Sequence, residues 1–259
     1  MGSESPDMPS SNHPIGLSET PDGTPIGSGG VDQPRILITA GPTHEPLDGV
    51  RYLANRSSGR LGLTLASAAT RRGAATTLLL GPTPLEPTDH SLLTVERFQT
   101  TADLEHLLGR TWPEHDLLLM AAAVADFRPK TLSQDGKHQR AGDGLTLELE
   151  ATPDLLAGLR TSSRPDQTRV GWALEPRERL LERSRMKLES KGLHAIVGNP
   201  IQTIDSERIE PTLLVATSAG PQSIPHPVEG PVAKDRFADW LLDQCLDLHG
   251  ARTAPSPRT

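Results

Sequence analysis

The stretch HDLLLMAAAVADF, residues 115–127, decides the fold class of this chain. Its centre is almost continuously apolar, whereas a strand with one face in water would alternate apolar and polar residues. A strand of this kind is buried on both faces, as in a parallel sheet that helices cover on both sides. We therefore expect residues 115–127 to form a central strand of an α/β domain.

Short apolar runs and amphipathic segments alternate on both sides of this stretch. Residues 35–40, 75–81 and 94–99 are predicted as strands, and 60–74 and 101–112 as helices. The alternation continues with a hairpin arm at 145–150, strands at 168–174, 193–199, 211–217 and 222–225, and helices at 176–192 and 233–250. Strands that alternate with helices predict right-handed βαβ crossovers. We expect a doubly wound, mostly parallel, Rossmann-like sheet with helices on both faces and a C-terminal edge β-hairpin.

The composition narrows the class of protein. The chain has 259 residues, a formal net charge of −7 and a single cysteine, Cys245. An acidic chain argues against a nucleic-acid binder, although clustered cations can still bind a small anion. One cysteine excludes an intrachain disulfide framework and a cysteine-rich metal site. We expect Cys245 to fill the core rather than to act as a nucleophile.

Both ends of the chain are polar and rich in Ser and Pro. We expect residues 1–33 and 251–259 to be disordered tails around one domain at 34–250. The N-terminal segment has neither a basic start nor an apolar core, so it is not predicted as a signal peptide. The chain has no run of about 18 apolar residues, so we expect no membrane span. These features predict a cytoplasmic protein.

Four polar clusters directly follow predicted strands. They are AGPTHEP (40–46), AVADFRPK (123–130), GWALEP (171–176) and VGNP (197–200). The carboxyl ends of parallel strands meet at one edge of the sheet, and ligands bind there. The clusters therefore predict a binding site at this edge.

The loop GVRYLANRSSGR, residues 49–60, lies between the first strand and the first helix, where phosphate-binding loops occur. Backbone N–H groups at a helix N-terminus attract anions, and the arginines add positive charge. The alternative is a serine N-cap followed by a turn that glycine eases. The loop matches neither G-x-x-x-x-G-K-[ST] nor G-x-G-x-x-G. Its candidate anion-binding residues are Arg51, Arg56, Ser57, Ser58, Gly59 and Arg60.

The segment AAAVADFRPK, residues 121–130, combines small residues with a carboxylate. Small residues at a strand end allow a flat ring to lie against the backbone, whose polar groups can bind the edge of the ring. Asp126 offers a carboxylate to a sugar hydroxyl, an amine or a metal. The alternative is a tightly packed strand end with a capping aspartate.

Three lysines are candidates for binding phosphate. Lys137 lies in the polar, glycine-containing stretch 130–144, which suits a mobile flap, and Lys187 and Lys191 share one face of a predicted helix. Lysines of this kind are usually only solvated, so each is weak evidence. The histidines form neither an H-x-x-x-H pair nor a Ser-His-Asp order, so we expect no zinc site and no catalytic triad.

Five stretches together resemble the phosphopantothenate–cysteine ligase family, the synthetase half of the bacterial bifunctional coenzyme A biosynthesis flavoprotein. They occur in the order and spacing of that family and span nearly all of residues 35–250. The stretches are LITAGPTHEPLDGVRYLANRSSGRLG (37–62), MAAAVADFRPK (120–130), LTLELEATPDLL (145–156), RVGWALEP (169–176) and KLESKGLHAIVGN (187–199).

The resemblance implies a reaction and its participants. The carboxylate of 4′-phosphopantothenate attacks the α-phosphate of CTP, and pyrophosphate leaves. The amino group of L-cysteine then displaces CMP from the acyl-cytidylate and forms an amide. The resemblance implies Mg²⁺, held mainly by the triphosphate, no flavin, and a homodimer. Because no decarboxylase half is recognisable, it also implies a separate phosphopantothenoylcysteine decarboxylase chain.

The resemblance also implies roles for individual residues. Asn55 matches the asparagine that donates to the acyl carbonyl, and Lys137 is equated with the lysine of the flap. The implied nucleotide-binding residues are Ala121, Ala122, Asp126, Pro153, Asp154, Leu155, Leu156, Trp172, Lys187 and Lys191. The implied substrate- or phosphate-binding residues are Gly41, Arg51, Ser57, Ser58, Gly59 and Arg60.

This chain departs from the family pattern at several positions. Trp172 stands where the family usually has Phe, Arg60 where it has Lys, and KHQR (137–140) where it has a flap like KIKK. The altered flap keeps open a non-catalytic nucleotide-binding homologue, in which Lys137→Ala would change little. An NAD(P)-dependent oxidoreductase is disfavoured, because the dinucleotide fingerprint and a ribose-binding carboxylate after the second strand are missing.

Overall fold

The computed structural model describes residues 33–131, 144–204 and 206–254. Lys137, residues 1–32 of the predicted N-terminal tail and residues 255–259 of the predicted C-terminal tail lie outside these residues. Contacts within the chain divide it into residues 1–32 and one compact unit, residues 33–259. No helix in the described ranges has the length and apolar character needed to cross a membrane.

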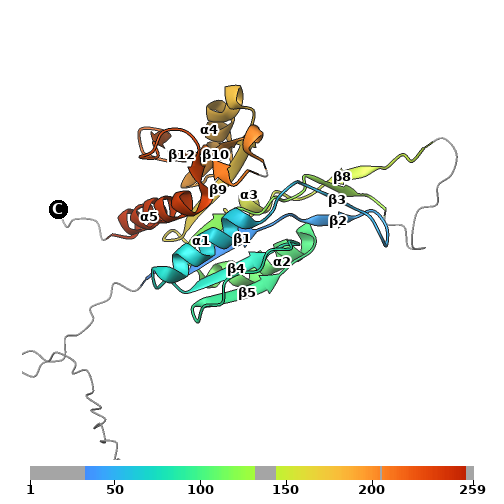
Figure 1. Cartoon of the computed structure of the whole chain (residues 1–259), viewed down its shortest axis with the longest axis horizontal. Coiled ribbons are helices and arrows are strands. Elements are labelled where there is room, and N and C mark those ends of the chain that lie inside the picture. The colour runs from blue at the N-terminus through green and yellow to red at the C-terminus, as the bar shows by residue number, and fades with distance from the viewer. Residues whose placement is uncertain (1–32, 132–143, 205, 255–259) are drawn as a thin grey trace, which may run out of the picture. The chain divides into compact units, whose positions relative to one another are not determined.

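A single eight-stranded sheet forms the centre of this unit, in the order β13-β12-β10-β9-β6-β1-β4-β5 (Figure 1). The parallel strands are β1 (Ile36–Ala40), β4 (Thr76–Leu80), β5 (Leu93–Arg97), β6 (Leu117–Met120), β9 (Thr168–Glu175) and β10 (Ala195–Pro200). At one edge β12 (Thr212–Val215) and β13 (Gln222–Ile224) add an antiparallel hairpin. The doubly wound, mostly parallel fold and its edge hairpin are therefore confirmed.

Helices cover both faces of the sheet. Helices α1 (Arg60–Arg71) and α5 (Lys234–Thr253) pack against each other and contribute to one apolar cluster. Helices α2 (Thr101–Thr111), α3 (Leu155–Gly158) and α4 (Leu180–Ser190) contribute to the cluster on the other face. Successive residues of a strand point to opposite faces of the sheet, so each strand contributes to both clusters. In β1, Ile36 and Ile38 belong to the first cluster and Leu37 to the second. Cys245 is buried in the first cluster and fills the core, as expected.

Short elements complete the unit. Two-stranded pairs join β2 (His44–Pro46) to β3 (Tyr52–Ala54), β7 (Phe127–Pro129) to β8 (Leu149–Ala151), and β11 (Arg208–Ile209) to β14 (Val232–Ala233). The 3₁₀ turns are η1 (Trp112–Glu114), η2 (Arg177–Arg179) and η3 (Ile201–Thr203). The β2–β3 and β7–β8 hairpins contact each other and run together away from the sheet (Figure 1).

The predicted central strand is shorter than expected. We predicted a strand over 115–127, whereas β6 ends at Met120 and the chain continues irregularly to Asp126. The N–H of Ala121 donates to the carbonyl of Thr39 at 3.1 Å, and the N–H of Ala122 donates to Oγ1 of the same threonine at 3.1 Å. The apolar run continues because this segment packs beside the end of β1, so an apolar pattern alone places the strand end too late.

Helix α5 is longer than predicted. It continues to Thr253, three residues beyond its predicted end at Gly250. Ala251 and Arg252 favour helix, and the Arg252 guanidinium donates to the carbonyl of Pro165 at 2.8 Å. This tertiary contact holds a turn that the sequence analysis assigned to the C-terminal tail.

Close packing of α1 on β1 brings the start of this helix to the sheet edge. A Cβ atom on Gly62 would lie 2.3 Å from Cβ of Ala40, so only glycine fits without movement of the backbone. Helix α1 therefore begins directly beside the carboxyl end of β1.

Candidate active site

A cavity of about 780 Å³ lies at the carboxyl ends of the parallel strands. The loop before α1 lines it with residues 54–62, and the segment after β6 lines it with residues 120–126. Residues 152–156, the ends of β9 and β10, and two lysines of α4 and its C-terminus complete most of its wall. Three of the four polar clusters, AVADFRPK, GWALEP and VGNP, therefore contribute residues to one cavity at this edge. The fourth cluster, AGPTHEP, does not line the cavity.

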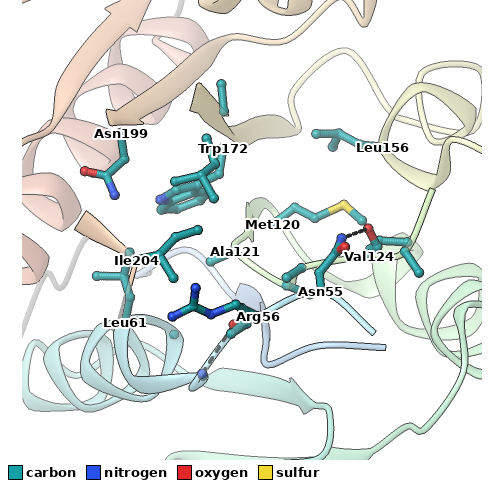
Figure 2. Close-up of a pocket in the computed structure, with 18 of the residues that line it drawn as sticks. Asn55, Arg56, Leu61, Met120, Ala121, Val124, Leu156, Trp172, Asn199 and Ile204 are labelled. Atoms are coloured by element: carbon teal, nitrogen blue, oxygen red, sulfur yellow. Dashed lines mark hydrogen bonds between the residues drawn. The ribbon is translucent and has the colours of Figure 1, made fainter. Parts of the chain in front are cut away.

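Asn55 joins the two longest segments of this wall. Its Nδ2 donates to the carbonyl oxygen of Val124 at 2.8 Å, a hydrogen bond visible in Figure 2. The bond uses one of the two amide hydrogens, so the second N–H and Oδ1 remain for a ligand. The predicted catalytic asparagine is thereby oriented by the backbone of the neighbouring segment.

The N-terminus of α1 presents unsatisfied donors to the cavity. Gly59, rather than a serine, is the N-cap, in the left-handed conformation with φ of 72°, and Oγ of Ser58 accepts the N–H of Arg60 at 3.4 Å. The N–H groups of Leu61 and Gly62 make no hydrogen bond to another described residue. Two free N–H groups and the helix dipole suit an anion. Ser57 and Ser58 also line this end.

The backbone at Ala121 and Ala122 faces the cavity mainly with acceptors. Both N–H groups are bound to Thr39, while neither carbonyl accepts a hydrogen bond from another described residue. A flat ligand with an exocyclic amine could therefore donate to these carbonyls. The exposed carboxylate of Asp126 lies at the end of the same segment and also lines the cavity.

The turn at Pro153–Leu156 is fixed to the end of α4. Oδ1 of Asp154 accepts the N–H of Ala157 at 3.1 Å and so caps α3. Nζ of Lys191 lies 2.9 Å from Oδ2 of Asp154. This ion pair holds a cation beside the turn that the sequence analysis predicted to cover a nucleotide.

Lys187 is held by a buried carboxylate. Its Nζ lies 2.7 Å from Oε1 of Glu175, and Nη1 of Arg183 lies 2.9 Å from Oε2. Burial acts to raise the pKa of Glu175, but hydrogen bonds and charge from Lys187 and Arg183 outweigh it and lower the pKa below the ordinary value. Glu175 is therefore ionised at neutral pH and fixes both cations.

Trp172 and Asn199 form the wall on the α1 and α5 side, at the ends of β9 and β10 (Figure 2). Nδ2 of Asn199 donates to Oγ1 of Thr203 at 2.6 Å. The indole N–H of Trp172 and Oδ1 of Asn199 are buried without a partner among the described residues. The apolar side chains of Leu61, Ile204 and Ile209 also line the cavity.

Of the predicted site residues that the structure describes, all but two line the cavity. Arg51 does not line the cavity, because Asp48 holds it, with 2.9 Å between Nε of Arg51 and Oδ2 of Asp48. Gly41 lies behind the wall, where its backbone is 3.4 Å from the position of a Cβ on Gly59. Lys137 lies outside the described residues.

Part of the lining was not predicted from the sequence. The residues that were not assigned to the site include Met120, Asn199, Ile201, Thr203, Ile204, Ile209 and Lys234. Met120 and Asn199 lie in stretches that were singled out by their position at the end of a predicted strand. The others carry no motif, and only tertiary packing brings them to the cavity.

Residues 31–247 match the family described as DNA/pantothenate metabolism flavoprotein C-terminal domain. The chain belongs to this family. The coenzyme A biosynthesis bifunctional protein CoaBC of Vibrio cholerae serotype O1 is 37% identical over 168 residues, 64% of this chain and 41% of that protein. A cysteine/cysteine sulfinic acid decarboxylase from an unknown prokaryotic organism is 39% identical over 168 residues, 65% of this chain and 46% of that protein. The chain thus spans less than half the length of these curated relatives.

A solved structure covers the same part of the family. The crystal structure of the C-terminal domain of CoaBC is 29% identical, has a TM-score of 0.66, and covers 85% of this chain and 98% of that domain. The resemblance to the synthetase half of the bifunctional flavoprotein, drawn from five sequence stretches, is therefore confirmed. All five stretches contribute residues to the cavity wall, and the stretch 145–156 contributes its last five.

Proposed function

We propose that this chain is a phosphopantothenate–cysteine ligase. It joins the carboxylate of 4′-phosphopantothenate to the amino group of L-cysteine and converts CTP to CMP and pyrophosphate. One observation carries the proposal: the hydrogen bond from Asn55 to Val124 joins the motif loop to the alanine segment in the wall of one cavity, which Lys187 and Lys191 also line.

The first step forms the acyl-cytidylate. A carboxylate oxygen of phosphopantothenate attacks the α-phosphorus of CTP, and the bond to the β-phosphate breaks as pyrophosphate leaves. Negative charge collects on the phosphates, so fixed donors and cations accelerate this step. The N–H groups of Leu61 and Gly62 and the ammonium groups of Lys187 and Lys191 supply them.

The second step forms the amide. The amine nitrogen of cysteine attacks the acyl carbon, the bond to the CMP oxygen breaks, and the amine proton passes to solvent. Charge develops on the acyl oxygen, which the second N–H of Asn55 stabilises. The scheme needs no protein nucleophile.

The nucleobase lies against Ala121 and Ala122 in this proposal. Their open carbonyls accept the exocyclic amine of cytosine, and Trp172 forms the wall of the nucleotide site. Adenine also carries an exocyclic amine, so the preference for CTP rests on the family resemblance. A comparison of CTP with ATP tests it.

Mg²⁺ bound mainly by the triphosphate supplies charge neutralisation at the phosphates. Asp126, an exposed carboxylate in the cavity wall, offers the type of oxygen ligand that Mg²⁺ prefers. The proposal includes a homodimer that needs no flavin and a separate decarboxylase chain that removes the carboxylate of the product.

Product analysis tests the proposed function. The purified chain is incubated with 4′-phosphopantothenate, L-cysteine, CTP and Mg²⁺, and mass spectrometry follows CMP and the ligated product. We expect both in equal amounts. Lys137→Ala abolishes ligation if the flap lysine is catalytic, and a wild-type chain that binds CTP without forming product would support the non-catalytic homologue instead.

A further inference from the structure

A second cavity, of about 580 Å³, lies next to the candidate active site on α4. It is lined by Glu175, Arg179, Glu182, Arg183, Met186 and Lys187. Lys187 also lines the first cavity, so the two cavities share this residue. The second cavity therefore adjoins the part of the site that holds the lysines, with Lys187 between the two.

Cations follow one another along α4 at intervals of four residues. Arg179, Arg183, Lys187 and Lys191 occur at this spacing, which places neighbours on the same side of a helix. The first three line the second cavity, and the last lines only the first. A row of positive charge thus leads from one cavity into the other.

A buried carboxylate fixes the middle of this row. The side chain of Glu175 is 6% exposed, and its two oxygens bind Arg183 and Lys187 separately. The side chain of Arg179 makes no contact with a charged or polar group among the described residues, and Glu182 is exposed at the same cavity. The lining thus holds three cations against two carboxylates, one of which is already paired on both oxygens.

We propose that the second cavity binds the pyrophosphate group, either as the terminal phosphates of the bound nucleotide or as the released product, with Arg179 and Arg183 as additional phosphate ligands. The inference rests on the proposed function for its physiological ligand. Guanidinium groups bind phosphate oxygens in pairs, whereas a lysine acts as a point charge. The arginines therefore extend the phosphate site beyond the two lysines that the family resemblance implies.

Isothermal titration of the full-length chain with inorganic pyrophosphate tests the proposal directly. We expect Arg179→Gln and Arg183→Gln each to weaken binding by about tenfold, because each removes a charge-assisted contact. Glu182→Gln tightens binding, because it removes a negative charge from the cavity lining. Arg185→Gln is the matched control: Arg185 is exposed on the same helix, two residues from Arg183, and lines neither cavity.

Two nucleotides separate the two sources of the ligand. If the cavity receives the terminal phosphates of the nucleotide, Arg183→Gln weakens the binding of CTP and of pyrophosphate but does not change the binding of CMP. If the cavity receives only the released product, the same variant weakens the binding of pyrophosphate alone. The proposal is wrong if Arg183→Gln and Arg185→Gln bind pyrophosphate equally, or if the wild-type chain does not bind it. These titrations measure binding without turnover, so their outcome is independent of whether the ligase assay detects product.

Discussion

Nδ2 of Asn55 lies 2.8 Å from the carbonyl oxygen of Val124, although 69 positions separate the two residues in the chain. This hydrogen bond links the loop before α1 to the segment after β6. It orients a side-chain amide beside backbone carbonyls that are open to a base. The acyl group and the nucleotide of the proposed intermediate can therefore be held by one rigid unit.

Replacement of Asn55 by Ala tests its role in the chemistry. The variant loses a donor to the acyl oxygen, so we expect kcat to fall by about 10²- to 10³-fold. The KM for CTP changes less, because the amide does not contact the nucleotide in this account. Steady-state kinetics of ligation measure both, with Val50→Ala as a control, because Val50 lies in the same loop, is exposed and does not line the cavity. A kcat within about threefold of the wild-type value would contradict the assigned role.

Lys191→Met tests whether the end of α4 binds phosphate. Loss of a cation that contacts the triphosphate raises the KM for CTP by about tenfold and leaves the KM for cysteine unchanged. Lys130→Met is a suitable control, because Lys130 is exposed and does not line the cavity. If both substitutions raised the KM for CTP equally, the effect would come from the net charge of the chain and not from a contact between Lys191 and the triphosphate.

His194 makes the stability of the fold depend on pH. Burial, followed by the charges of Arg252, Arg169 and His249, lowers the pKa of His194 to about 4. Its Nδ1 accepts the backbone N–H of Arg169 at 2.9 Å, which requires that nitrogen to be unprotonated. The unfolded chain, with the higher pKa, binds the proton first. Stability is therefore complete above about pH 6.5 and is lost as the pH falls from there towards 4.

Urea unfolding at pH 7.5 and pH 4.5 measures this effect. We expect His194 to contribute roughly 2 kcal/mol of the loss in unfolding free energy, after allowance for its partial exposure. His194→Asn keeps an acceptor near the Nδ1 position and does not titrate. Between pH 7.5 and pH 4.5 this variant should therefore lose less unfolding free energy than the wild type, by the contribution of His194. If the variant and the wild type lose the same free energy, another group is responsible.

Cys245 is predicted to be inert in the folded protein. Complete burial raises the pKa of its thiol to about 12, so almost no thiolate forms at neutral pH. A thiol reagent should label the chain in urea but not in buffer, as mass spectrometry would show. Because Cys245 is the only cysteine, no other thiol can contribute. Rapid labelling without denaturant would mean that α5 opens locally.

The sheet could be predicted because its strands are short and buried on both faces. Residues 36–40 lie between Arg35 and Gly41, and residues 76–80 end at Gly81, so the sequence gives these strand ends closely. Residues 115–127 have no such boundary, and the strand end at Met120 is set by hydrogen bonds from Ala121 and Ala122 to Thr39. Local sequence does not contain that information.

Part of the candidate site could likewise be predicted from the sequence, and part could not. Asn55, Lys187 and Lys191 lie in motifs at strand or helix ends, and topology carries them to one edge. The pairing of Arg51 with Asp48 was not foreseen, since charge alone does not show which arginine already has a partner. Ile204 and Lys234 reach the cavity only through packing of the C-terminal part of the chain.

Pyrophosphate release by the purified chain tests the central claim most directly. The assay contains 4′-phosphopantothenate, L-cysteine and Mg²⁺, compares CTP with ATP, and omits each substrate in turn. We expect continuous release that requires both 4′-phosphopantothenate and L-cysteine and is faster with CTP than with ATP. Faster release with ATP would agree with ligase activity but would contradict the assignment of cytosine to the carbonyls of Ala121 and Ala122. No release with either nucleotide would contradict the proposed function.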